Sequence, residues 1–563
     1  MMNTVIFGLQ IFAAAGLSVW LWIMRPWLAQ RDWHKTYFWA TSAAISSAAV
    51  AAFSVPDLLA GKEAPSAGLF LVGIVVAAMI VTMLRNVWYW LAEKVGIAVG
   101  GASKDHIRGA ALADERAVAK QLKHAPSRFS VGQVPVPIDV ETTGFLIAGA
   151  TGTGKSHTIT RALDALRADG ALAVIADASG VYVSRYYHEG VDAIINPFDD
   201  RCVRWSPLSE LESVADVPAL AKSLVPDGQG SAAEWNGYAQ TFVEAVLEHC
   251  FTAGLGNGEL FRILAVADIE ELREICAGTP SQPLLADGNE RMFGSIRGIA
   301  SSAAKFLQYL DPNADTQNGF SIRRYLRGQR AGYLFLSYQQ HHLNSLKRMI
   351  ACAVDVASLS VLSLPPSSDR RVIFALDEMP LLGRIQSIID LATNGRKHGT
   401  MLFVGLQDIA QLRELYGHNN AQTLASNLRS QLTLCVGDGE TAEYMSFKLG
   451  DEEKTRKVES GGTSSSFTSG ANTSKNWQEQ VVKERVVLPS ELMNLPNMRG
   501  FFKLSGFAQT AVVNLRPAEV CKVAEAFISA PPRVRAKPQV KQQEHAGGTS
   551  RDAAAEIDSL DLL

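Results

Sequence analysis

A glycine-rich segment that ends in lysine and serine has the clearest chemical meaning in this sequence. Residues 149–156 match the pattern G-x-x-x-x-G-K-[ST] at every fixed position. In such a loop, backbone N–H groups turn inward toward a phosphate chain, the lysine reaches the β- and γ-phosphates, and the serine hydroxyl can ligate Mg²⁺. The segment therefore predicts a site for ATP and Mg²⁺, formed by Gly149, Ala150, Thr151, Gly152, Thr153, Gly154, Lys155 and Ser156.

An acidic pair, Asp377-Glu378, follows a run of apolar residues and could supply the groups that hydrolysis requires. We expect Asp377 to hold Mg²⁺ through water beside the glycine-rich loop, and Glu378 to orient and polarise the attacking water. The alternative is that the pair only caps the start of a helix. Given the phosphate-binding loop, we favour the catalytic role, in which Lys155 also takes part.

Two further polar residues, Gln407 and Arg396, could complete this site. Gln407 ends an apolar run, so its amide could hydrogen-bond the γ-phosphate or the attacking water. Arg396 lies on a polar turn before that run, from which its guanidinium could stabilise the γ-phosphate of a neighbouring subunit. An arginine that acts between subunits requires a ring with one site at each interface. For both residues, an ordinary solvated side chain is the alternative.

Hydrophobic patterning indicates the elements that must position these groups. Short apolar runs at 145–148 and 171–176 flank a helical pattern at 156–168, which is the strand–helix–strand order of a sheet covered on both faces. Further strands, separated by helices, are predicted at 332–337, 371–376, 401–406 and 432–436. The sequence therefore predicts an α/β domain.

This pattern is interrupted between residues 207 and 315, where comparable strand signals are missing. Amphipathic helical segments dominate there, and they include 234–253, 269–277 and 292–309. We therefore predict an α/β domain formed by residues 86–206 and 319–530, with an all-α domain inserted at 207–318.

Three uncharged stretches precede the α/β region, and each is about as long as a helix that crosses a membrane. They are residues 5–24, 36–55 and 67–84. Basic residues in the short connecting segments place 25–35 and everything after residue 85 in the cytoplasm. We therefore predict a transmembrane anchor at 1–85, which makes this a multi-pass protein of the inner membrane with its catalytic part in the cytoplasm. The alternative is a signal peptide followed by core helices.

Composition and local patterns limit how the chain could bind nucleic acid or metal, and they indicate the structure of the remaining segments. The chain has 563 residues and a formal net charge of −3, so contact with nucleic acid must depend on a local patch. Its six cysteines are isolated, which argues against a zinc module. Composition predicts the character of four further segments: helical signals at 110–123, extended chain at 131–140, a mobile Ser/Thr-rich surface loop at 460–474, and a disordered tail at 531–563.

In this order, the motifs resemble those of the type IV coupling proteins of conjugative plasmids, the TraD/TrwB family. The resemblance covers roughly residues 125–525. The segments that carry it are residues 149–156, 171–180, 196–199, 234–238, the pair Asp377-Glu378, 395–397 and 405–412. The sequence departs from the family at its N-terminus, because it has three apolar stretches where relatives commonly show two.

The resemblance implies a RecA-like ATPase that assembles into a homo-hexameric ring on inner-membrane lipids. It would receive a relaxase-bound single strand of DNA and drive it toward the channel proteins of a type IV secretion system. Lys155 would match the family's phosphate-binding lysine, Asp377-Glu378 its acidic pair, Arg396 its proposed arginine finger and Gln407 its sensor. Two other readings stay open: a double-stranded DNA translocase of the FtsK kind, and a receptor that uses nucleotide only to dock secretion substrates.

Overall fold

The structure, a computed structural model, describes residues 106–531 except 329–330, 467–468 and 520. The three predicted membrane spans lie outside the described residues, and so does the predicted tail apart from residue 531. In the described part of the chain, no helix combines the length and the apolar composition that a membrane crossing requires.

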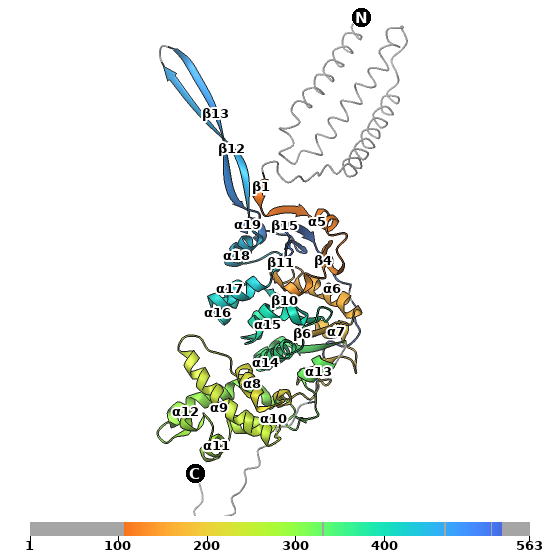
Figure 1. Cartoon of the computed structure of the whole chain (residues 1–563), viewed down its shortest axis with the longest axis vertical. Helices are drawn as coiled ribbons and strands as arrows, with labels where there is room; N and C mark the ends of the chain where they lie inside the picture. The colour runs from red at the N-terminus through yellow and green to blue at the C-terminus, as the bar shows by residue number, and fades with distance from the viewer. Residues whose placement is uncertain (1–105, 329–330, 467–468, 520, 532–563) are drawn as a thin grey trace, which may run out of the picture. The chain divides into compact units, whose positions relative to one another are not determined.

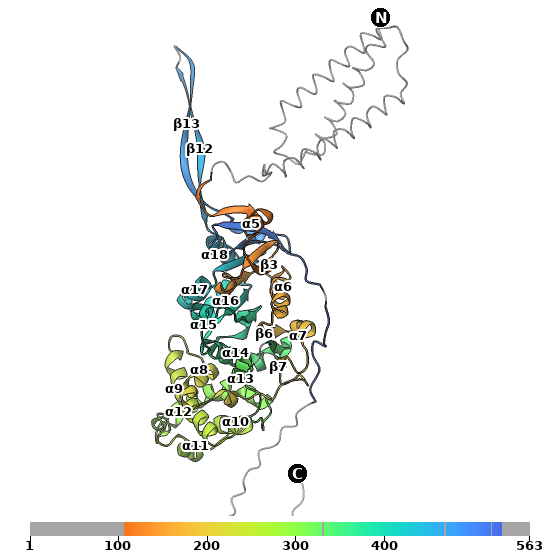
Figure 2. The same cartoon turned by 45° about the vertical axis from the view of Figure 1, so that its right-hand side comes forward.

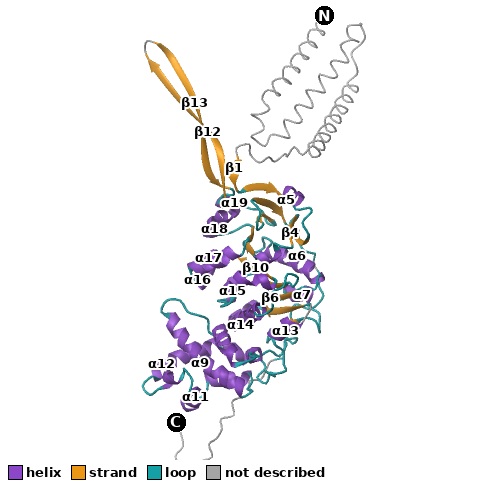
Figure 3. Ribbon diagram, in the orientation of Figure 1, coloured by secondary structure: helices purple, strands orange, loops and turns teal. Residues whose placement is uncertain are grey.

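A ten-stranded sheet forms the centre of the described chain (Figure 3). Its strand order is β2-β15-β14-β11-β5-β10-β9-β6-β8-β7. The seven strands from β11 to β7 are parallel, whereas β14 is antiparallel to both of its neighbours. In sheet order, the strands are Ala111–Asp114, Gln509–Asn514, Arg499–Lys503, Ser430–Thr433, Phe145–Ala148, Thr400–Leu406, Val372–Leu376, Leu172–Ala178, Gly332–Tyr338 and Ala193–Ile194.

The central strands are apolar throughout because both faces of the sheet are covered. In β5, Leu146 belongs to one hydrophobic cluster and Phe145 to a second cluster on the opposite face. The helices α6 (Lys155–Ala168) and α7 (Val181–Tyr186) contribute to the second cluster, and α14 (Leu343–Leu362) contributes to the first. Parallel strands buried in this way carry continuous apolar runs, which is why the sequence predicted them.

The chain between β7 and β8 contains no strand among its described residues. Its α-helices gather at one end of the sheet (Figure 1), where α8 packs against α14. They are α8 (Val217–Leu224), α9 (Ala232–Thr252), α10 (Asn257–Ala265), α11 (Ile269–Cys276), α12 (Glu290–Ala303) and α13 (Ile322–Gly328). The predicted helical segment 292–309 is divided, because a short 3₁₀ helix, Lys305–Tyr309, follows α12.

The remaining α-helices connect or flank the strands of the sheet. They are α5 (Glu115–Gln121), α15 (Ile388–Asn394), α16 (Ile409–Tyr416), α17 (His418–Asn427), α18 (Gly439–Leu449) and α19 (Pro489–Met493). The extended chain predicted at 131–140 is confirmed only in part. β3 (Ser127–Val131) and β4 (Val134–Pro137) form an antiparallel hairpin, whereas residues 132–133 and 138–140 are turns. The helical signal at 110–123 was only partly right, because residues 111–114 pair with β15 as strand β2 before α5 begins.

The prediction of a mobile loop at 460–474 was wrong. The segment belongs to a long antiparallel hairpin of β12 (Asp451–Ser466) and β13 (Ser469–Arg485), which β1 (His106–Gly109) joins at its base. Pairing runs from Asp451↔Arg485 to Ser466↔Ser469. Backbone hydrogen bonds hold a ladder of this kind whatever the polarity of its side chains, so a Ser/Thr-rich composition does not exclude strands.

After β15 the chain runs along the helices α6 and α7 instead of ending at the sheet (Figure 2). The amides of Val523 and Ala524 donate to the carbonyl of Ser184 at 2.8 and 3.0 Å. Further along, the amide of Ala530 donates to the carbonyl of Phe198 at 2.9 Å. The described chain therefore ends near β7, at the opposite edge of the sheet from β15.

Candidate active site

The loop 149–156 connects the carboxyl end of β5 to the first turn of α6. Gly152 and Gly154 have φ angles of +79° and +119°, which L side chains rarely adopt. A Cβ at Gly149 would lie 2.6 Å from Thr153 Oγ1 and 2.9 Å from Leu434 Cβ. The predicted glycine positions are therefore the ones that this loop shape requires.

Lys155 is buried at the centre of this loop. Its Nζ donates to the carbonyls of Gly149 at 2.6 Å and Ala150 at 3.4 Å, and it lies 3.5 Å from Glu378 Oε2. The ammonium is therefore held over the loop beside the acidic pair. This is the position expected of the lysine that contacts phosphate oxygens in such a loop.

Ser156 and Asp377, the two predicted magnesium ligands, are in direct contact. Ser156 Oγ donates to Asp377 Oδ2, and the Tyr182 hydroxyl donates to the same oxygen at 3.3 Å. The other oxygen, Asp377 Oδ1, is buried without a hydrogen-bond partner. Burial raises the pKa of the Asp377 carboxyl, although its contact with Ser156 opposes this shift.

This pair of ligands fits Mg²⁺ better than a metal with an all-protein cage. In the described residues, no group of three or more His, Cys, Asp or Glu side chains could hold a metal. Mg²⁺ usually takes one or two protein oxygens and completes its shell with water and substrate phosphates. The unsatisfied Asp377 Oδ1 is the acceptor that such an ion, or a water molecule bound to it, would occupy.

Glu378 and Gln407 meet at the carboxyl edge of the sheet. Gln407 Nε2 donates to Glu378 Oε2 at 2.9 Å. They are neighbours because β10 lies between β5 and β9, so that one parallel sheet edge brings the ends of all three strands together. Burial raises the pKa of the Glu378 carboxyl, and the charge of Lys155 opposes this shift.

The close approach of β10 to the acidic pair depends on Gly405. A Cβ at this position would lie 1.8 Å from the carbonyl oxygen of Asp377. We expect Gly405→Ala to lower the free energy of unfolding by about 1–3 kcal/mol, as overpacking of a core does. Urea unfolding measures this change. Gly437→Ala is the matched control, because no atom lies within 4 Å of a Cβ at Gly437, and an equal loss in both variants would contradict the prediction.

Sequence reasoning did not assign Asp177 or Tyr182 to the site, although Asp177 ends an apolar run as Asp377 does. Asp177 is completely buried in β6, and its Oδ2 accepts from the amide of Val183 at 2.7 Å. Its Oδ1 has no partner, and burial raises the pKa of this carboxyl to about 7. A second acidic strand end was the available sequence signal for Asp177.

The raised pKa of Asp177 predicts how stability depends on pH in the absence of nucleotide. An unfolded aspartate has a pKa of ~3.9, so between ~pH 4 and ~pH 7 the unfolded chain has lost the proton that the folded chain keeps. Asp177 therefore makes the free energy of unfolding fall as pH rises, by at most ~1.4 kcal/mol per pH unit. We expect Asp177→Asn to remove this contribution. Urea unfolding across this range measures both slopes, and equal slopes would refute the assignment.

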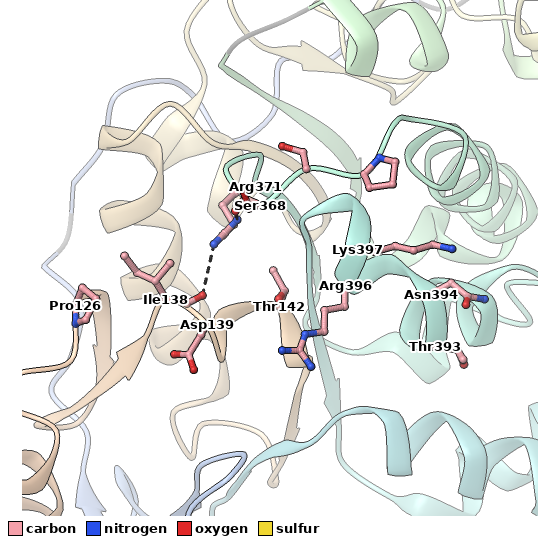
Figure 4. Close-up of a pocket in the computed structure, with 12 residues that line it drawn as sticks. Pro126, Ile138, Asp139, Thr142, Ser368, Arg371, Thr393, Asn394, Arg396 and Lys397 are labelled. Carbon is pink, nitrogen blue, oxygen red and sulfur yellow. Dashed lines mark hydrogen bonds between the residues drawn. The ribbon is translucent and has the colours of Figure 1, made fainter.

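Arg396 is the one predicted catalytic residue that the structure does not bring to the others. It is exposed on a 3₁₀ turn, Gly395–His398, before β10 begins, whereas Gln407 follows the end of that strand. Seven residues at ~3.3 Å each separate the two edges of the sheet by ~23 Å. Arg396 and Lys397 instead line a cavity of about 990 Å³ with Arg371, Asp139 and Thr142 (Figure 4).

A parallel sheet with a lysine-bearing glycine loop at its carboxyl edge, and an acidic pair two strands away, defines an α/β protein of the P-loop class. The sequence profile of the family described as "Type IV secretion-system coupling protein DNA-binding domain" matches residues 128–516. The chain belongs to this family.

Individual relatives agree with this assignment. The coupling protein TraD of Escherichia coli K12 is 28% identical over 469 residues, which cover 82% of this chain and 64% of TraD. The coupling protein VirD4 of Bartonella quintana is 24% identical over 299 residues, which cover 50% of this chain and 46% of VirD4. The chain thus spans less than two thirds of the length of these relatives.

Solved structures of the plasmid coupling protein TrwB have the same fold. The unbound form of TrwBdeltaN70 is 31% identical with a TM-score of 0.69, and the match covers 77% of this chain and 98% of that one. Other structures contain TrwB with the ATP analogue ADPNP, and TrwB with ADP and Mg²⁺. Each is 30% identical to this chain, with a TM-score of 0.68.

Proposed function

We propose that this chain is the coupling ATPase of a conjugation system. It binds ATP and Mg²⁺ at the loop 149–156 and uses hydrolysis to move relaxase-bound single-stranded DNA toward a type IV secretion channel. The observation that carries the proposal is the convergence of Lys155, Glu378 and Gln407 within hydrogen-bond or ion-pair distance at one sheet edge. The nucleotides bound in TrwB support the choice of ATP and Mg²⁺.

The side chains divide the chemical work. The amides of residues 149–154 and Lys155 hold and neutralise the phosphates. Ser156 and Asp377 hold Mg²⁺, which supplies charge stabilisation at the phosphate oxygens when it is bound. Glu378 accepts a proton from the attacking water, and its raised pKa makes it a better base near neutral pH. Gln407 orients that water and detects the γ-phosphate through the hydrogen bond to Glu378.

We further propose that the chain works as a hexameric ring anchored in the inner membrane by residues 1–85. Single-stranded DNA, relaxase and channel proteins are its partners. Arg396 acts in trans, because ~23 Å of β10 separates it from the site of its own chain. A neighbouring subunit can present it to the γ-phosphate from the opposite side, where charge develops during phosphoryl transfer.

Mixing two inactive variants tests the trans role of Arg396. We expect Arg396→Ala and Lys155→Thr each to be inactive alone, whereas a mixed ring regains intact interfaces. In an equal random mixture, about a quarter of the interfaces pair a functional Lys155 with a functional Arg396. ATP turnover should therefore rise toward about a quarter of the wild-type rate. A mixture that only averages the two variants would contradict action in trans.

Turnover of the purified full chain tests the proposed function itself. We expect ATP hydrolysis that single-stranded DNA stimulates more than duplex DNA of equal length. Stronger stimulation by duplex DNA would favour a double-stranded DNA pump. Nucleotide binding without turnover, with or without DNA, would favour a docking receptor and refute the ATPase.

A further inference from the structure

Two chain segments leave the candidate active site, one after Glu378 and one after Gln407, and both form hydrogen bonds with the same loop. This junction loop, residues 225–231, connects α8 to α9 in the helical insertion. It is anchored at its start to α9, because Asn236 Nδ2 donates to the carbonyl of Pro226 at 2.8 Å. Its contacts therefore join the active-site edge of the sheet to the helical insertion.

The segment after Glu378 reaches the junction loop through Gln386. Gln386 Nε2 donates to Asp227 Oδ2, and the amide of Asp227 donates to Gln386 Oε1 at 3.4 Å. The other carboxylate oxygen, Asp227 Oδ1, accepts from Gln240 Nε2 of α9 at 3.0 Å. One half-buried carboxylate thus connects the segment after the proposed general base to the long helix α9.

The segment after Gln407 reaches the same loop through α16. Asp408 caps the start of this helix. The last carbonyls of a helix have no partner within it, and here the junction loop provides one. Gln229 Nε2 donates to the carbonyls of Glu414 at 3.4 Å and Leu415 at 3.0 Å. The helical insertion therefore caps the end of the helix whose start adjoins Gln407.

The two routes are also joined to each other before they reach the loop. The Tyr416 hydroxyl accepts from the amide of Ile385 at 2.9 Å and donates to its carbonyl at 3.3 Å. Both residues are buried. Breaking these hydrogen bonds would leave buried polar groups without partners, which is energetically unfavourable. We therefore expect Gln386 and the end of α16 to move as a unit. Because α16 is ~12 Å long, a tilt of this helix at the end next to Gln407 displaces its other end.

We propose that Asp227 and Gln229 are positioning residues for α9. Through them, binding of a nucleoside triphosphate at the candidate active site determines how firmly the first turns of α9 are held. Contact of the γ-phosphate with Gln407, which is hydrogen-bonded to Glu378, sets the positions of the two segments that follow these residues. The junction loop transmits this change of position to the helical insertion. Neither residue touches the reacting atoms. The inference rests on the proposed function, because it takes a nucleoside triphosphate as the ligand.

Hydrogen exchange of the full chain, with and without ADPNP and Mg²⁺, tests the inference. In the wild type, we expect exchange to slow by about tenfold both in the loop 149–156 and in the first turns of α9. In Gln229→Ala/Gln386→Ala, the loop should stay protected while the response of α9 disappears. Protection of the loop also establishes that the double variant is folded. Gln282→Ala, which changes another glutamine of the insertion, should respond as the wild type does.

The possible results separate the two proposals. A wild-type α9 that does not respond although the loop is protected overturns the inference and leaves the ATPase proposal standing. An α9 response that survives in the double variant also overturns it, because the signal then travels by another route. A loop without protection in the wild type refutes the proposed function and the inference together.

Discussion

Replacing Lys155 by threonine should lower ATP turnover by about 10²–10³-fold or more, the usual loss when one charge-stabilising donor is removed. Lys155 Nζ lies 2.6 Å from the carbonyl of Gly149 and 3.5 Å from Glu378 Oε2. Threonine cannot reach the phosphates from this position, so the contribution of the lysine to neutralising the triphosphate and the charge that develops on it is lost. Phosphate release under saturating ATP measures the effect.

The matched control for this variant is Lys222→Thr, which changes an exposed lysine of α8. It should retain turnover within about twofold, since surface substitutions away from a site have small effects. Far-ultraviolet circular dichroism of both variants should overlay that of the wild type. If Lys155→Thr turns over ATP at the wild-type rate, the loop is not the catalytic phosphate site.

Glu378→Gln should bind ATP and fail to hydrolyse it, with turnover lower by about 10²–10⁴-fold, as expected for a lost general base. The amide keeps the size of the side chain but cannot accept a proton from water. Because burial raises the pKa of Glu378, wild-type turnover should also rise with pH as this carboxyl ionises, and the variant should lack that rise. Single-turnover hydrolysis of labelled ATP separates binding from chemistry.

Asp408→Asn is the control for this second variant. Asp408 lies next to Gln407, and its carboxylate caps α16 by accepting from the amide of Ala410 at 2.7 Å. Asparagine is an equally good N-cap, so this variant should stay active. Rapid multiple turnover by Glu378→Gln would remove Glu378 from its proposed role and leave Asp377 and Asp177 as the acidic candidates.

The strands that carry the site were predictable because they are buried on both faces. β5 was predicted at its observed bounds, and β10 within one residue of them. Short apolar runs between glycine or polar residues have few other interpretations in an α/β protein. The contact between Ser156 and Asp377 then follows from the parallel order of β5, β10 and β9.

Features that depend on distant partners could not be predicted in the same way. The local sequence of β2 favoured a helix. Its strand conformation depends on pairing with β15, which lies nearly 400 residues later and leaves no trace in the local pattern. The composition of residues 460–474 does not reveal the partner strand of each half. The raised pKa of Asp177 reflects burial that the whole fold creates. The position of Arg396 before β10 was predicted, whereas its contact with a neighbouring subunit stays a prediction.

The pairing of β2 with β15 also sets the order in which this protein can mature on the ribosome. Ala111 leaves the ribosome 398 residues before Gln509, its partner in the sheet. At ~5–20 residues per second, β2 waits ~20–80 s for a neighbour. Near the end of that interval, the edge of β11 is also open to other chains from the synthesis of Thr433 until β14 begins at Arg499, 66 residues later. At the same rate this takes ~3–13 s, so nascent protein needs protection from aggregation until β14 and β15 have been made.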